Sequence, residues 1–187
     1  MNKLVKFLPH AGIIACLAFI CIYGCSFAPA YLVSWAIFQT WALYFIAGAT
    51  PKAGLRAMVC YMLGVLASVL IFWLAGMLGG SNPVVAIVGA LVTFTVICME
   101  KAPYIDYIPA YFIGAGAYFA LSTINMPSGN ATPGFQILVM LITCLAGSLL
   151  GYATVVFRTM YANFQAQKEA ASAPPAQAVP QPQEVEA

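Results

Sequence analysis

Three long stretches of the sequence contain no Asp, Glu, Lys or Arg: residues 7–51, 57–99 and 107–157. A helix that crosses a bilayer needs about 20 apolar residues. Each stretch is therefore long enough for two membrane-spanning helices. This absence of charge, more than any motif, limits what the chain can fold into.

The composition agrees with this pattern. Hydrophobic residues make up 63% of the chain and charged residues 6%, against about 45–50% and about 25% in soluble domains. A soluble fold needs more polar surface to cover its core. The formal net charge of +2 is too small to attract a polyanion. These values exclude an ordinary soluble enzyme, a nucleic-acid-binding protein and a disordered chain.

Turn-forming residues divide each stretch near its middle, at 26–29, 79–83 and 125–133, because Gly, Pro, Ser and Asn favour loops. The sequence thus predicts an all-α integral membrane protein with a short N-terminus (1–9) and a transmembrane domain (10–158). A tail rich in Ala, Pro, Gln and Glu (159–187) is expected to be largely disordered. The six predicted helices lie near 10–27, 30–49, 54–78, 84–99, 107–124 and 134–157. Runs that are apolar on all sides disfavour the alternating strands of a β-barrel.

The basic residues predict the topology. With six helices, all seven Lys and Arg residues fall on one side of the membrane, and cytoplasmic loops are the ones that carry excess Lys and Arg. Both termini are therefore expected to be cytoplasmic. A cleaved signal peptide is the alternative for the first helix. It is disfavoured because Pro29 would follow the cleavage site directly and because only five spans would remain.

A weak internal repeat relates the two halves of the chain. An offset of 74 residues superimposes the second predicted helix on the fifth, and an offset of 83 superimposes 64–66 on 147–149. The identities at the first offset are Pro29/Pro103, Ala36/Ala110, Phe38/Phe112, Tyr44/Tyr118 and Phe45/Phe119. A repeat of three helices inverts the second copy in the membrane, a design that recurs in transporters and places the permeation site between the repeats.

Under this hypothesis the second and fifth helices line the permeation path. The candidate lining residues are Trp35, Gln39, Thr40, Tyr111, Gly114 and Tyr118. The Gln39 amide lies in the middle of its helix and needs a protein or water partner, and Gly114 leaves room for a solute. The alternative is that Gln39 bonds to a neighbouring helix and that the glycine only tightens packing. Small-xxx-small patterns such as Gly147-x-x-x-Gly151 likewise fit packing within one subunit or between subunits.

Residue types that are missing from the predicted spans limit the possible functions further. No ionisable residue lies in the middle of a predicted span, whereas proton-coupled pumps usually place one there. The single His and the six cysteines do not have the spacing of a zinc site. Cys21 and Cys25 lie one turn apart, and apolar packing is favoured over ligation of a soft metal. We expect no enzymatic activity, metal or cofactor.

The motifs of the second and fifth helices resemble those of a known family. The residues that carry the resemblance are Ser34, Trp35, Ala36 and Phe38, then Tyr44, Phe45 and 51–55, and in the second half Pro109, 112–115, Ala117, Phe119 and Ala120. Over roughly Gly12 to Tyr152 the chain resembles small bacterial inner-membrane proteins of the DUF1097 group. That resemblance implies a six-helix protein of the bacterial inner membrane and brings no established substrate or catalytic residue.

Together these observations predict a multi-pass inner-membrane protein, assembled as a homo-oligomer, that acts as a passive channel or facilitator for a small neutral or weakly charged solute. Its expected partners are the lipid bilayer, further copies of itself and the solute, with no nucleic acid. The alternative is a non-transporting membrane subunit or scaffold that stabilises or recruits a partner protein.

Overall fold

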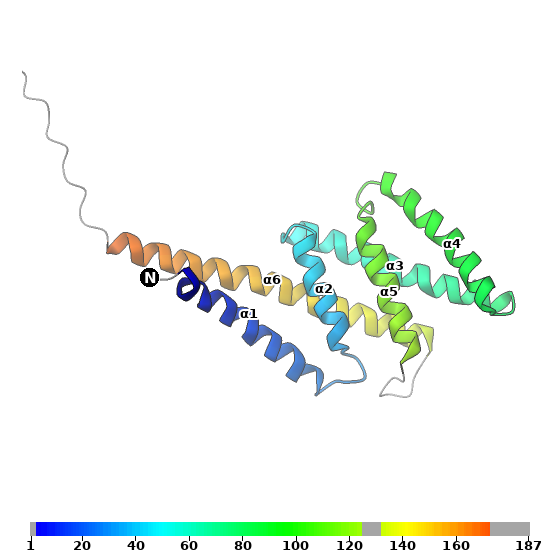
Figure 1. Cartoon of the computed structure of the whole chain (residues 1–187), viewed down its shortest axis with the longest axis horizontal. Coiled ribbons are helices and arrows are strands. Elements are labelled where there is room, and N and C mark those ends of the chain that lie inside the picture. Colours follow the sequence, from blue (N-terminus) through cyan, green and yellow to red (C-terminus); the bar gives the residue numbers. More distant parts are fainter. Residues whose placement is uncertain (1–2, 125–131, 173–187) are drawn as a thin grey trace, which may run out of the picture.

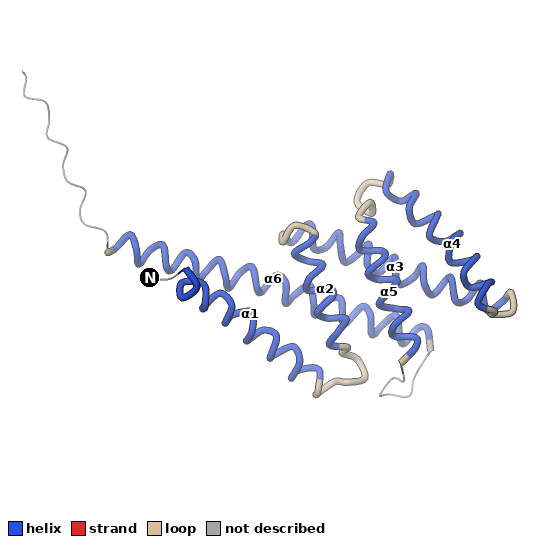
Figure 2. The backbone as a smooth tube through the Cα atoms, in the orientation of Figure 1, coloured by secondary structure: helices blue, strands red, loops and turns tan. Residues whose placement is uncertain are grey.

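The computed structural model describes residues 3–124 and 132–172, with side chains from Phe7 onward. In chain order its elements are α1 (Lys3–Cys25), α2 (Ser34–Ile46), α3 (Pro51–Met77), α4 (Asn82–Cys98), the 3-10 turn η1 (Met99–Lys101), α5 (Ile108–Thr123) and α6 (Pro133–Ala171) (Figure 1). This part of the chain contains helices joined by loops and no strand (Figure 2). The all-helical prediction is confirmed for the described residues.

Four helices of the described part are long and apolar enough to cross a membrane. These candidate spans are Phe7–Cys25, Pro51–Met77, Asn82–Lys101 and Pro133–Ala171. Their outer faces expose large apolar side chains, such as Phe19 and Phe94 at 66% and 71%. Such continuous apolar exposure is unfavourable in water and normal in lipid. The chain is therefore a multi-pass membrane protein.

Local sequence explains how most helices begin. Proline occupies the first turn of α3, α4, α5 and α6, where its missing N–H costs no helical hydrogen bond and its fixed φ suits the helix. The Thr50 hydroxyl also caps α3 by accepting a hydrogen bond from the Ala53 N–H at 3.3 Å. Gly79 and Gly80 both take positive φ in the turn between α3 and α4, which glycine adopts without steric penalty.

The second helix is shorter than predicted. The sequence indicated 30–49, but α2 has only 13 residues. Residues 26–33 form turns and irregular backbone around Pro29, and the left-handed backbone of Gly48 and Ala49 ends the helix. With 16 residues, α5 is also short. At 1.5 Å per residue the two helices span about 20 Å and about 24 Å, less than the hydrocarbon thickness of about 30 Å.

The first and last helices are longer than predicted. α1 begins at Lys3 and runs through Pro9. α6 continues to Ala171, so residues 159–171, predicted as the start of a disordered tail, are helical. Ala, Gln, Lys and Glu in this segment are strong helix formers, and they extend a helix whose nucleation cost has already been met. Residues 1–2, most of the predicted loop at 125–133 and the tail from residue 173 lie outside the described residues.

The packing has a paired organisation. The short helix α2 packs mainly across α6, and the short helix α5 packs mainly across α3 (Figure 1). The peripheral helices follow the same scheme, since α1 packs on α6 and α4 packs on α3. α1 and α4 lie at opposite ends of the view in Figure 1. α3 and α6 also contact each other and join the two halves.

Glycines let the backbone of each short helix come into close contact with its long helix. A Cβ added to Gly64 of α3 would overlap the Tyr111 carbonyl of α5, and one added to Gly114 would overlap the Tyr61 carbonyl of α3. On the other side, a Cβ on Gly147 of α6 would overlap Thr40 and Ile37 of α2. Small residues drive such close contacts in lipid. The Gly147-x-x-x-Gly151 pattern therefore serves packing within one subunit.

We predict that Gly64→Ala lowers the stability of the protein by about 1–3 kcal/mol, the usual cost of overpacking, because the clash is with backbone that cannot rotate away. Gly116→Ala is the matched control, since a Cβ there meets nothing within 4 Å. The thermal unfolding midpoint in a mild detergent measures both variants. An unchanged midpoint for Gly64→Ala would contradict the close α3–α5 contact.

Candidate functional site

The short helix α2 has one buried face and one exposed face. Ala36, Ile37, Thr40, Leu43 and Tyr44 are buried. The opposite face, with the three- and four-residue spacing of a helix, is exposed: Phe38, Gln39, Ala42, Phe45 and Ile46. This exposed face, which we call the outer face of α2, is apolar except for the Gln39 amide.

Gln39 lies level with the middle of the uncharged part of α6. The hydroxyl of its neighbour Thr40 is 3.5 Å from the carbonyl oxygen of Thr143. Thr143 lies close to the middle of the uncharged part of α6, residues 133–157. No described residue forms a hydrogen bond with the Gln39 amide. Transfer of an unpaired amide from water into hydrocarbon costs about 4–8 kcal/mol, so this side chain needs water or another protein as its partner.

The other predicted residues lie elsewhere. Thr40, Tyr111 and Tyr118 are buried at 1–3% exposure, and Gly114 is buried against the Tyr61 backbone. Trp35 is half-buried and packs against the core. The six predicted residues therefore do not face one common space within a protomer. Four of them lie where a short helix packs on a long helix: Thr40, Tyr111, Gly114 and Tyr118.

Hydrogen bonds account for the buried hydroxyl groups among these residues. Thr40 donates to the Ala36 carbonyl of its own helix at 3.1 Å. Tyr111 donates to the Ile105 carbonyl at 3.0 Å, and Tyr118 donates to Gln136 Oε1 at 2.9 Å. A hydroxyl that is already paired within the protein offers little to a passing solute. These hydroxyl groups therefore contribute to packing within the protomer.

Polar contacts that the sequence did not predict join α2 to α6. The Trp41 indole N–H donates to Thr154 Oγ1 at 3.0 Å, and the Thr154 hydroxyl donates to the Leu150 carbonyl at 2.7 Å. Gln136, the partner of Tyr118, is also buried. Trp41 and Thr154 are 113 residues apart, and nothing in their local sequence marks them as a pair. Only the polarity of Thr154 in an apolar helix offered a signal.

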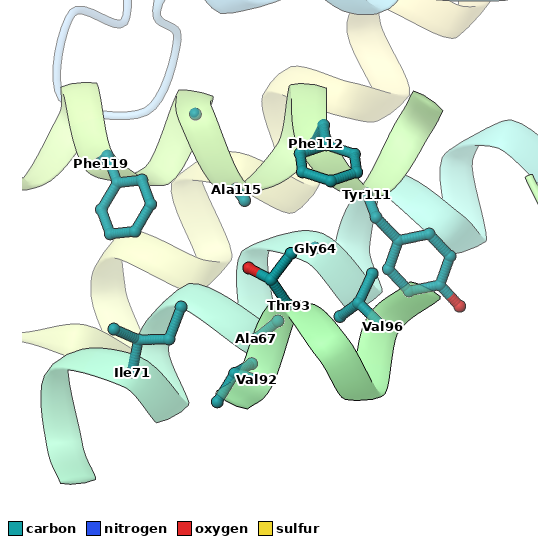
Figure 3. A pocket seen from close by; sticks show the side chains of 11 residues that line it. Gly64, Ala67, Ile71, Val92, Thr93, Val96, Tyr111, Phe112, Ala115 and Phe119 are labelled. Atoms are coloured by element: carbon teal, nitrogen blue, oxygen red, sulfur yellow. The ribbon is translucent and has the colours of Figure 1, made fainter. Parts of the chain in front are cut away.

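A groove between α3, α4 and α5 has a volume of about 270 Å³. Figure 3 shows Phe112 and Phe119 of α5 on one side of it and Thr93 and Val96 of α4 on the other. Of the six predicted residues, Tyr111 is the one that lines it. The lining is apolar apart from the hydroxyl groups of Thr93 and Tyr111, and the Tyr111 hydroxyl already donates to Ile105. The groove therefore suits a hydrocarbon chain better than a polar solute.

The charged residues gather at one end of the helices. Arg56, near the start of α3, forms an ion pair with Asp106, which precedes α5. Arg158 of α6 lines a common hollow with His10 of α1 and Ala49. The His10 and Tyr161 rings, near the start of α1 and in the late part of α6, are 5.1 Å apart. The fold thus brings the segments that carry charge to one side.

One comparison with known proteins gave a match. The family model described as "Protein of unknown function (DUF1097)" matches residues 11–158, from α1 to the end of the uncharged part of α6. The chain belongs to the DUF1097 family. The comparisons with curated proteins and with solved structures gave no match. The matched region of this DUF1097 protein contains both short helices, the whole of α3, and α6 as far as residue 158.

We predict that Thr154→Val destabilises this DUF1097 protein by about 1 kcal/mol, because the buried Trp41 N–H loses its acceptor. Thr154→Ser is the matched control, since it keeps the hydroxyl. Unfolding in a mild detergent, followed by the thermal midpoint, compares the two variants. Equal midpoints for the Val and Ser variants would show that the hydrogen bond contributes nothing measurable.

Proposed function

We propose that the protein is a bacterial inner-membrane protein built from two inverted three-helix repeats, α1–α3 and α4–α6, with both termini in the cytoplasm. The equivalent contacts of the two halves support this. The 74-residue offset relates Ile37 to Tyr111, and the 83-residue offset relates Gly147 to Gly64. Gly147 packs against the Ile37 carbonyl, and Gly64 packs against the Tyr111 carbonyl. The repeat found in sequence thus pairs residues that occupy equivalent places in the packing.

Within this scaffold the protein is a passive facilitator for a small neutral or weakly charged solute and has no enzymatic activity. The single observation that carries this function is the exposed Gln39 amide at mid-depth on a short helix. A pair of short segments at corresponding positions of two repeats is the best general pointer to a transport site. α2 and α5 form such a pair.

The solute path runs along the outer face of α2, between protomers of a homo-oligomer. Thr40 and Gly114 lie in close contacts between helices, which leave no room for a solute beside these two residues. Gln39 points away from these contacts and offers both a donor and an acceptor. A second copy would bury the rest of the face while water or solute pairs with the amide.

We predict that the purified protein accelerates the entry of one small solute into proteoliposomes and that Gln39→Leu slows this entry about five- to ten-fold, since one hydrogen bond to the solute is lost. Stopped-flow light scattering with water, glycerol, urea, formate and acetate measures the rates. Gln167→Leu is the matched control, because Gln167 is exposed on α6 beyond Arg158.

Both variants are first compared with the parent protein by elution volume and thermal midpoint, so that misfolding is not mistaken for lost flux. Equal rates for Gln39→Leu and the parent would contradict a path at α2. No acceleration of any solute by folded protein would favour the other candidate, a membrane subunit whose exposed Gln39 bonds to a helix of a partner protein.

The topology has its own test. We predict that alkaline phosphatase fused after Ala171 is inactive in cells and that the same enzyme inserted between Gly79 and Gly80 is active, because the enzyme works only outside the cytoplasm and the charged end faces inward. Green fluorescent protein at the same two positions gives the opposite pattern. Activity after Ala171 would overturn the proposed orientation.

A further inference from the structure

A second groove lies at the charged end of α3. Its volume is about 480 Å³, within the range of small-molecule sites. Its lining combines the cations Lys52 and Arg56 with the apolar side chains of Leu55, Val59, Tyr104 and Ile105. From Thr50 to Val59 the groove follows α3 for about 13 Å at 1.5 Å per residue, from the charged end into the uncharged part of the helix.

The two cations differ in how they are held. Arg56 Nη2 pairs with Asp106 Oδ1, and the guanidinium lies 5.8 Å from the centre of the Tyr107 ring. These contacts fix its position and offset its charge. The Lys52 ammonium is exposed and has no partner among the described residues. The groove therefore keeps one uncompensated positive charge at its polar end.

We propose that this groove binds one anionic phospholipid, with its phosphate on Lys52 and Arg56 and an acyl chain along Leu55 and Val59. Basic pockets at the ends of membrane helices recognise lipid headgroups in this way. A free phosphate would use only the cations and leave the apolar lining unfilled. A zwitterionic lipid would bring a second positive charge beside Lys52. The exposed Tyr104 ring suits the headgroup level, where aromatic residues collect.

Native mass spectrometry of the full chain in a non-ionic detergent tests the site. Phosphatidylglycerol and phosphatidylcholine with the same acyl chains are the two probes. We expect phosphatidylglycerol to bind more tightly and Lys52→Gln to weaken it about five-fold. Lys101→Gln is the matched control, because Lys101 is also exposed and does not line the groove.

A second pair of variants tests the apolar part. Val59→Trp is expected to fill the groove and reduce phosphatidylglycerol binding. Leu66→Trp places the same ring two turns further along α3, outside this groove. Both parent residues are exposed, at 41% and 47%, so neither substitution disturbs the core.

Three results would overturn the proposal. The first is an equal loss of phosphatidylglycerol binding in Lys52→Gln and Lys101→Gln, and the second is equal affinity for the two lipids. The third is displacement of phosphatidylglycerol by millimolar inorganic phosphate. The last result would identify a site for a soluble anion. Binding is measured without solute flux, so its outcome is independent of the proposed facilitator.

Discussion

The structure depends on the backbone contact between each short helix and its long helix. In lipid, apolar side chains gain nothing by leaving the solvent, so helices associate through close packing and hydrogen bonds. Gly64 and Gly114 let α3 and α5 meet at their carbonyl groups, and Gly147 does the same for α6 and α2. Once these two pairs have formed, α1 and α4 need only pack on the outside, and α4 buries a single residue, Val88.

This contact also determines which face of α2 remains available. Because Thr40 packs toward Gly147, the adjacent Gln39 is turned outward, to the surface that a lipid or a second copy would cover. An amide at that depth is costly unless it has a partner. The inner face of α2 therefore packs on α6 and stabilises the protomer. Its outer face carries an amide that requires a hydrogen-bond partner outside the protomer. The proposed path between protomers follows from this division.

The charged end has a different role. The Arg56–Asp106 pair joins the start of α3 to the segment before α5, and it forms at the membrane boundary, where water lowers the cost of charge. Lys52, one turn earlier on α3, is left without a counter-ion among the described residues. The apolar groove beside it continues toward the hydrocarbon. The ion pair that joins α3 to the segment before α5 and the proposed lipid site thus use neighbouring residues of one helix.

The sequence by itself determined that the chain is helical and crosses the membrane, because long uncharged stretches allow little else, and its internal repeat relates Gly64 to Gly147. It did not determine that α2 has only 13 residues, that α6 runs on to Ala171, or that Gln39 faces outward while Thr40, Tyr111, Gly114 and Tyr118 are buried. The physical reason is that a membrane protein is as apolar outside as inside. Periodicity then carries no signal for which face is buried, and only the tertiary contacts at the glycines decide it.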